Sequence, residues 1–304
     1  MHLLPENIVN LSAASTDPVE FAFARDQQIT AAVLRLDKID PIISGNKWFK
    51  LKYYLEAALQ RKQQSILSFG GAYSNHIIAV ACAAHKAGLD SIGIIRGEKP
   101  ATLSPTLVAA AAWGMQLRFV SRDQYNQKNN PAFIEQWQKE FGDPCIIPAG
   151  GAGAKGIQGS AEILQLVAIE QYTHVICAVG TGTLLTGLAG GLLPGKELLG
   201  IAVLKGLEEW WPEELTKDSA GRVRIVTDYH FGGYAKKTAE LIGFMNEWYA
   251  TTGIPTDFVY TAKLFFAVSD LVKKDFFPKK SRLLVIHSGG LQGNQSLPGK
   301  TLAF

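Results

Sequence analysis

Short apolar runs alternate with longer stretches of helical length along most of the chain. The short runs are rich in β-branched residues, as strands are, while the longer ones have helical spacing. This alternation is typical of parallel sheets covered by helices, so the sequence predicts an α/β fold. The expected strands cover residues 32–36, 65–69, 91–95, 116–120, 145–148, 174–179, 198–203, 222–226 and 282–287. The expected helices cover residues 47–60, 75–87, 131–141, 156–170, 182–193, 234–250 and 260–273, with one more beginning at Pro105 after a Ser104 cap.

Three of the expected strands end in glycines that lead directly into a helix or turn: Gly70-Gly71, Gly180-Thr181-Gly182 and Gly289-Gly290. In open α/β sheets, ligands bind beyond the carboxyl ends of the strands, where helix N-termini present free amides. Three such ends predict one shared ligand crevice. The glycine-rich run at residues 148–159 is expected to connect two domains.

Composition excludes several classes of protein. The net charge is +3 and the basic residues are scattered, so nucleic acid is not an expected partner. No apolar run approaches the roughly 20 residues of a membrane span, and the N-terminus lacks the pattern of a secretory signal. Cys82, Cys145 and Cys177 lack metal-ligand or redox spacing. We therefore expect buried thiols, no metal site and a cytoplasmic location.

The loop of Gly180, Thr181, Gly182 and Thr183 has the composition of an anion-binding turn. Glycines allow close approach of the backbone, the threonines add hydroxyl donors, and a helix follows. A phosphate group is its natural ligand. The spacing is not GxGxxG, which argues against a dinucleotide. A plain turn between a strand and a helix remains open as an alternative.

Lys47 and Lys50 follow a loop of small residues at the start of an expected helix. Three positions apart, they share one helix face, so one can form a Schiff base while the other pairs with a phosphate of the same ligand. Two solvated surface lysines are the alternative.

Ser74 and Asn75 follow the double glycine of Gly70-Gly71, where another helix begins. Either residue could simply cap that helix. His76 has no neighbouring carboxylate in the sequence and no GxSxG motif occurs, so a serine hydrolase is not supported.

Taken in order, these segments resemble the D-cysteine desulfhydrase and 1-aminocyclopropane-1-carboxylate (ACC) deaminase family of fold-type II pyridoxal-phosphate enzymes. The resemblance extends from Gly45 to Gly290. It implies two open, twisted, mostly parallel sheets flanked by helices, with pyridoxal 5'-phosphate in the cleft between two domains. The large domain would comprise residues 1–50 and 159–304, and the small domain residues 51–158. It also implies a homodimer.

The resemblance assigns roles to single residues. Lys47 of the GNK motif would hold the cofactor aldehyde as a Schiff base, and Lys50 would contact the phosphate together with Gly180, Thr181, Gly182 and Thr183. Ser74 would face the substrate, and Asn75 would lie near the phenolic oxygen of the cofactor. Tyr234 and Tyr260 keep the spacing of the two active-site tyrosines of the family.

Thr261 and Ser288 resemble the desulfhydrase versions of two cofactor-facing positions, where ACC deaminases have glutamate and leucine. The resemblance therefore implies a lyase that converts D-cysteine into pyruvate, hydrogen sulfide and ammonia, with a neutral partner for the pyridine nitrogen. The segments Trp48-Phe49, Ala235-Lys236-Lys237 and Leu291-Gln292-Gly293 depart from the family pattern. ACC deamination, amino-acid racemisation and pyridoxal-phosphate binding without turnover stay open as alternatives.

Overall fold

The computed structural model describes residues 4–5, 7–22, 24–207 and 221–304. Its larger sheet has six strands in the order β1-β2-β10-β7-β8-β9. Every neighbouring pair is parallel except β1 and β2, which are antiparallel. The strands are β1 (Ser15–Val19), β2 (Thr30–Arg35), β7 (His174–Val179), β8 (Glu197–Ala202), β9 (Val223–Val226) and β10 (Arg282–His287).

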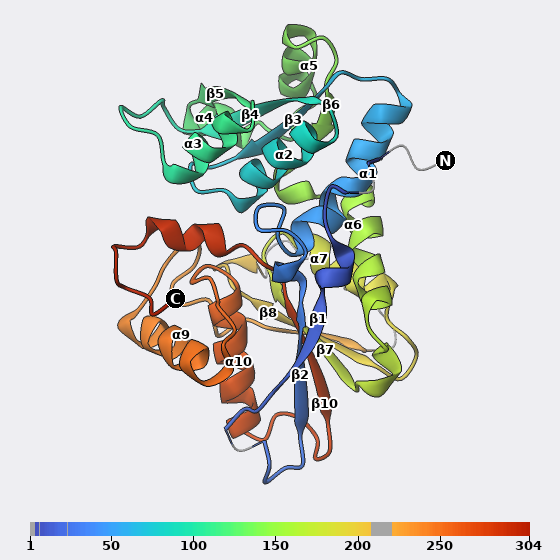
Figure 1. Cartoon of the computed structure of the whole chain (residues 1–304), viewed down its shortest axis with the longest axis vertical. Helices are drawn as coiled ribbons and strands as arrows, with labels where there is room; N and C mark the ends of the chain where they lie inside the picture. Colours follow the sequence, from blue (N-terminus) through green and yellow to red (C-terminus); the bar gives the residue numbers. More distant parts are fainter. Residues whose placement is uncertain (1–3, 6, 23, 208–220) are drawn as a thin grey trace.

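The smaller sheet has four parallel strands in the order β5-β4-β3-β6. They are β3 (Ser65–Gly70), β4 (Asp90–Arg96), β5 (Gln116–Val120) and β6 (Cys145–Ile147). Figure 1 shows this sheet and its helices above the six-stranded sheet, with α1, α6 and α7 between them. The two sheets therefore belong to separate parts of the fold, with these helices between them.

Most helices begin where the sequence supplies a capping side chain. Ser74, Ser104 and Thr238 each accept a hydrogen bond from the backbone amide three residues later. The helices are α1 (Asn46–Gln60), α2 (Asn75–Lys86), α3 (Pro105–Ala112), α4 (Arg122–Asn126), α5 (Pro131–Glu140), α6 (Ala154–Ala161), α7 (Thr183–Gly190), α9 (Ala239–Thr252) and α10 (Thr261–Lys273). Short 3-10 turns are η1 (Leu11–Ala13), η2 (Leu36–Lys38), η3 (Ala149–Gly151), η4 (Glu162–Leu166), η5 (Ile169–Gln171) and η7 (Leu291–Ser296).

The central strand β7 is buried along its whole length and divides the large core. Val175, Cys177 and Val179 pack on the side of α1 and α7, whereas Ile176 and Ala178 pack on the side of α9 and α10. Because successive strand residues point to opposite faces, a strand covered on both faces has to be apolar throughout. This burial explains the uninterrupted apolar run of β7.

The predicted α/β class and its two mostly parallel sheets are confirmed. The predicted helix at 156–170 is wrong in its second half, since α6 ends at Ala161 and short 3-10 turns follow. The predicted helix at 234–250 begins only at Ala239. The domain division stays a prediction; its boundaries fall inside α1 and α6, which pack against each other.

The three cysteines carry free thiols in the structure. Cys82 and Cys177 are buried, whereas Cys145 is only half-buried, so the expectation of burial is wrong for that residue. None of the helices in the described part of the chain is long and apolar enough to cross a membrane.

Candidate active site

A cavity of about 460 Å³ lies where the predicted glycine-rich strand ends converge. Its wall includes the start of α1, the β3–α2 and β7–α7 loops and the end of β10. The carboxyl ends of strands from both sheets thus open into one space, as the sequence predicted. Ten of the predicted site residues line it: Lys47, Lys50, Ser74, Asn75, Gly180, Thr181, Gly182, Tyr234, Tyr260 and Ser288.

The loop that carries Lys47 is packed directly onto the end of β10. Gly45 has a φ of +67°, and a Cβ atom at this position would lie 1.9 Å from the Ser288 carbonyl oxygen. The Asn46 amide donates a hydrogen bond of 3.2 Å to the same oxygen. Only glycine at position 45 permits this approach, which fixes the start of α1 against the opposite end of the chain.

Lys47 and Lys50 point from α1 into the cavity with amines that are easily deprotonated. The Lys47 Nζ atom donates a hydrogen bond of 2.8 Å to Asn46 Oδ1. Burial lowers the pKa of Lys47 to about 8, although Asp257 opposes the shift. Burial and then the charge of Lys47 lower the pKa of Lys50 to about 7. A neutral amine is the form that attacks a carbonyl, and a nearby anion would restore the charge of Lys50.

The β7–α7 loop forms an anion-binding turn at the N-terminus of α7. Gly182 has a φ of +78°, a conformation that glycine adopts without strain. The hydroxyl groups of Thr181 and Thr183 lie 3.0 Å apart. The first amides of a helix have no acceptor within the helix, so they are free to bind an anion. Thr183 itself is buried and does not line the cavity.

The N-terminus of α2 presents a second set of polar groups to the cavity. Ser74 caps this helix, because its Oγ accepts a hydrogen bond of 3.3 Å from the Ile77 amide, and it also lines the cavity. Asn75 Nδ2 donates to the Gly290 carbonyl oxygen at 2.9 Å. Asn75 Oδ1 and His76 Nδ1 are buried without a hydrogen-bond partner. Unpaired buried acceptors of this kind are costly unless a ligand supplies a donor.

The two predicted tyrosines lie together. The rings of Tyr234 and Tyr260 make an edge-to-face contact with centroids 6.5 Å apart. Burial, then Tyr234 and Asp257, raise the pKa of Tyr260 above its usual range. Tyr260 therefore stays protonated at neutral pH, which leaves its hydroxyl able to donate a hydrogen bond or a proton. Tyr234, with 56% of its surface exposed, lies at the open side.

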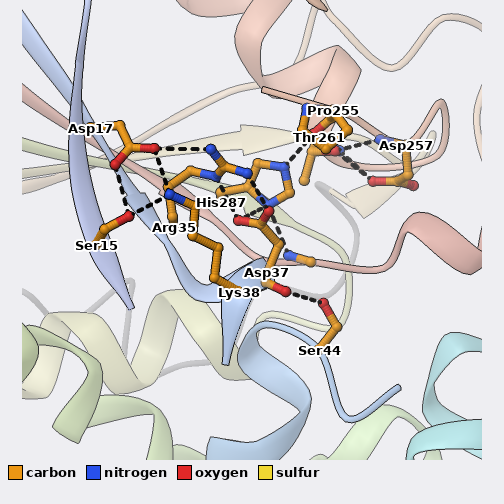
Figure 2. A network of polar contacts seen from close by, with 11 residues as sticks. Ser15, Asp17, Arg35, Asp37, Lys38, Ser44, Pro255, Asp257, Thr261 and His287 are labelled. Carbon is orange, nitrogen blue, oxygen red and sulfur yellow. Dashed lines mark hydrogen bonds and ion pairs between the residues drawn. The ribbon is translucent and has the colours of Figure 1, made fainter. Parts of the chain in front are cut away.

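The structure does not bring Thr261 into the cavity wall. Its hydroxyl donates a hydrogen bond of 2.8 Å to Asp257 Oδ1 and accepts one of 2.7 Å from the Asp257 amide. Figure 2 shows this pair beside His287. Asp257 Oδ2 accepts from the amides of Val259 and Tyr260, so the carboxylate caps α10. Of the two positions compared with ACC deaminases, only Ser288 lines the cavity.

A buried ionic network supports the end of β10 (Figure 2). Arg35 donates to both oxygens of Asp37 at 2.8 and 2.6 Å and to Asp17 at 3.0 Å. Asp37 Oδ1 lies 3.3 Å from His287 Nδ1, and His287 Nε2 donates to the Pro255 carbonyl oxygen at 2.7 Å. The network thereby joins β2, η2 and the segment that precedes Ser288.

Four further residues near the cavity were not predicted. Arg96, Arg122 and Tyr125 line it from the small-sheet side, where they follow the ends of β4 and β5. Because they lie at or just after the ends of predicted strands, the sequence could have indicated them as cavity residues. Lys263 is fully buried and donates hydrogen bonds to the carbonyl oxygens of Val203, His230 and Gly233. It holds the segment that precedes Tyr234, a contact no local sequence pattern indicates.

A family model described as pyridoxal-phosphate dependent enzyme matches residues 21–289. A Pyrococcus horikoshii protein provisionally named 1-aminocyclopropane-1-carboxylate deaminase is 30% identical over 86% of this chain and 85% of its own. The mitochondrial bifunctional D-cysteine desulfhydrase/1-aminocyclopropane-1-carboxylate deaminase of Arabidopsis thaliana is 25% identical over 83% of this chain and 70% of its own.

A similar fold occurs among solved structures. A crystal structure described as an ACC deaminase homologue superimposes with a TM-score of 0.79 at 27% identity. The similarity covers 97% of this chain and 92% of the other.

Proposed function

The chain belongs to the family of pyridoxal-phosphate dependent enzymes, and on this basis we propose that it is a lyase that removes the β-substituent of D-cysteine. The predicted cofactor and the predicted relationship to ACC deaminases and D-cysteine desulfhydrases are confirmed. The preference for D-cysteine over ACC and the role of each site residue are parts of this proposal.

The residues of the cavity fit pyridoxal phosphate. Lys47 has a desolvated amine for the aldehyde, and the α7 N-terminus with Lys50 offers an anion site for the phosphate. The unpaired Asn75 Oδ1 and His76 Nδ1 show that polar groups in the wall lack a partner. We assign the phosphate to Lys50 and residues 180–183, and the surroundings of the phenolic oxygen to Asn75.

Bound pyridoxal phosphate supplies an electron sink for the bond that breaks at Cα of an amino acid. The N-terminal amides of α2 and the Ser74 hydroxyl would hold the substrate carboxylate. Lys47 would take the Cα proton, since its pKa of about 8 leaves part of the amine neutral near pH 7. Tyr260 or Tyr234 would donate a proton to the departing sulfur. Loss of hydrogen sulfide and addition of water then give pyruvate and ammonia.

One observation carries the preference for D-cysteine. Among the described residues that line the cavity, none is an aspartate or a glutamate. The pyridine nitrogen would therefore have neutral neighbours such as the Ser288 hydroxyl, and the electron sink would be weaker than with a carboxylate partner. Elimination of a good leaving group needs less stabilisation than opening a carbon ring does. The names of the relatives keep ACC deamination as the second candidate.

The proposal is tested by product analysis on the purified protein loaded with pyridoxal phosphate. Pyruvate and sulfide from D-cysteine are compared with α-ketobutyrate from ACC, and L-cysteine serves as the stereochemical control. We expect kcat/KM to be highest for D-cysteine. Faster turnover of ACC would make the protein a deaminase of that substrate. Absence of keto acid from all three amino acids would refute the lyase function.

A further inference from the structure

The charged residues that line the cavity are all basic. They are Lys47, Lys50, Arg96 and Arg122, and no lining carboxylate in the described part of the chain balances them. His76 also lines the cavity, but burial lowers its pKa to about 3, so its ring is neutral. Lys47 and Lys50 are accounted for by the aldehyde and the phosphate of the cofactor. Arg96 and Arg122 are left without a role in the proposed reaction. This surplus of positive charge requires an explanation, because neither arginine contacts the groups that hold the cofactor.

The two arginines occupy equivalent places on neighbouring strands. Arg96 is the last residue of β4, and Arg122 follows the end of β5. Ser74, the proposed carboxylate site, follows β3, which lies next to β4 in the sheet order β5-β4-β3-β6. Neighbouring strands are about 4.8 Å apart, so the arginines lie roughly one and two strand spacings from the Ser74 loop. An arginine side chain is long enough to reach from either strand end toward the Ser74 loop.

Neither guanidinium has a hydrogen-bond or ion-pair partner among the described residues. Arg118 lies on β5, the strand that precedes Arg122, and it does have an ion-pair partner. Its Nε atom lies 3.7 Å from Glu140 Oε1. Burial raises the pKa of Tyr125, the charge of Arg96 opposes this shift and Tyr234 adds to it, so Arg96 and Tyr234 both lie near Tyr125.

We propose that Arg96 and Arg122 bind a second anionic group, carried on the side chain of the amino-acid substrate. This inference rests on the proposed function and narrows it to amino acids with an anionic β- or γ-substituent, or with one that departs as an anion. A guanidinium binds a carboxylate or phosphate with paired hydrogen bonds, which supports this chemistry. Hydrosulfide leaving D-cysteine is the smallest member of the class.

Calorimetric titration of the cofactor-loaded protein tests the inference without turnover. The probes are glutamate against glutamine and aspartate against asparagine, each as both enantiomers, because each pair differs in charge at nearly constant size. We expect the acids to bind at least about fivefold more tightly than the amides, as two partly exposed charge-assisted contacts allow. The preference should weaken with rising salt.

The double variant Arg96→Gln with Arg122→Gln should abolish the preference while leaving the affinity for the amides unchanged. Arg118→Gln is the matched control and should keep the preference. Equal binding of acids and amides by the wild type, or a preference that survives in the double variant, would overturn the inference. Keto-acid production from D-cysteine is measured on the same samples. A lyase without charge preference would refute only the arginine site, whereas loss of both signals would refute the proposed function as well.

Discussion

Two parts of the cavity wall differ in how firmly the fold holds them. The buried wall, residues 44–50 and 287–290, is almost entirely inaccessible, and its two segments contact each other through Gly45, Asn46 and Ser288. The exposed wall, formed by Tyr73, Arg96, Arg122 and Tyr234, lies mainly at the edges of the cavity, with Tyr73 46% exposed. The buried wall suits a permanently held group, and the exposed wall suits a ligand that enters and leaves.

The two walls also differ in their basic side chains. The buried wall contains the two lysines whose pKa burial lowers, so their charge depends on what lies beside them. The exposed wall contains arginines, whose planar guanidinium groups suit paired hydrogen bonds to an anion. We infer that the buried wall determines whether the cofactor stays attached and that the exposed wall selects among amino acids.

The largest effect is expected at the covalent anchor. Lys47→Ala should remove the visible absorption band of the bound cofactor and all turnover, because Lys50, the other lysine of the cavity, is assigned to the phosphate. The fold should persist, which circular dichroism and a thermal melt would show. Lys52→Ala, on the same helix but outside the cavity, is the control. A Lys47→Ala protein that regains the band through another lysine would contradict the assignment.

A smaller effect is expected from the ionic network beneath the buried wall. Asp37→Ala leaves Arg35 buried with only Asp17 as a partner, and should lower the free energy of unfolding by about 3 kcal/mol. The matched control is Glu20→Ala, which breaks the exposed Arg25–Glu20 pair and should cause no measurable change. Urea unfolding of the three proteins gives the comparison.

The same variant has a pH signature. Burial opposes ionisation of Asp37, but the Arg35 hydrogen bonds and the charges of His287 and Arg35 prevail, so its pKa lies below the ordinary 3.8. The stabilisation is therefore complete above that pH and is lost as the pH falls through the lowered folded-state pKa. The difference between wild type and Asp37→Ala should shrink in acid. A difference that is constant with pH would contradict the ionic origin.

The smallest effect tests the division between the walls directly. Lys50→Ala should weaken binding of pyridoxal phosphate by about 1.5–3 kcal/mol, the worth of one charged hydrogen bond. Arg96→Gln should leave the cofactor dissociation constant unchanged, because Arg96 belongs to the exposed wall. Equilibrium dialysis measures both. Equal weakening of cofactor binding in the two variants would contradict the inference that the buried wall alone holds the phosphate.

The buried wall was the more predictable part from the sequence. Its glycines and lysines are adjacent in the chain, and their conformational and chemical requirements are local. The position of Tyr234 was harder, since the segment before Ala239 is held out of the helix by Lys263, which contacts the carbonyl oxygens of His230 and Gly233. That contact joins distant segments and has no local signal.

Strand β1 was missed for a different reason. Its sequence, Ser15–Val19, is mostly polar and contains Pro18, which resembles a loop. As an edge strand it pairs only with β2 and can accommodate a proline and an exposed face. Thr261 was assigned to the cofactor from the resemblance alone. Its hydroxyl is instead hydrogen-bonded to Asp257, four residues earlier, at the start of α10.

The place of β10 in the large sheet has a consequence for biosynthesis. This strand, Arg282–His287, lies between β2 and β7 although it leaves the ribosome after both of them. Before β10 is made, β2 and β7 lack the strand that lies between them, and the Lys47 loop lacks the Ser288 carbonyl against which it packs. Cofactor attachment should therefore follow the synthesis of β10, and chains that end before β10 should be targets for chaperones and proteases.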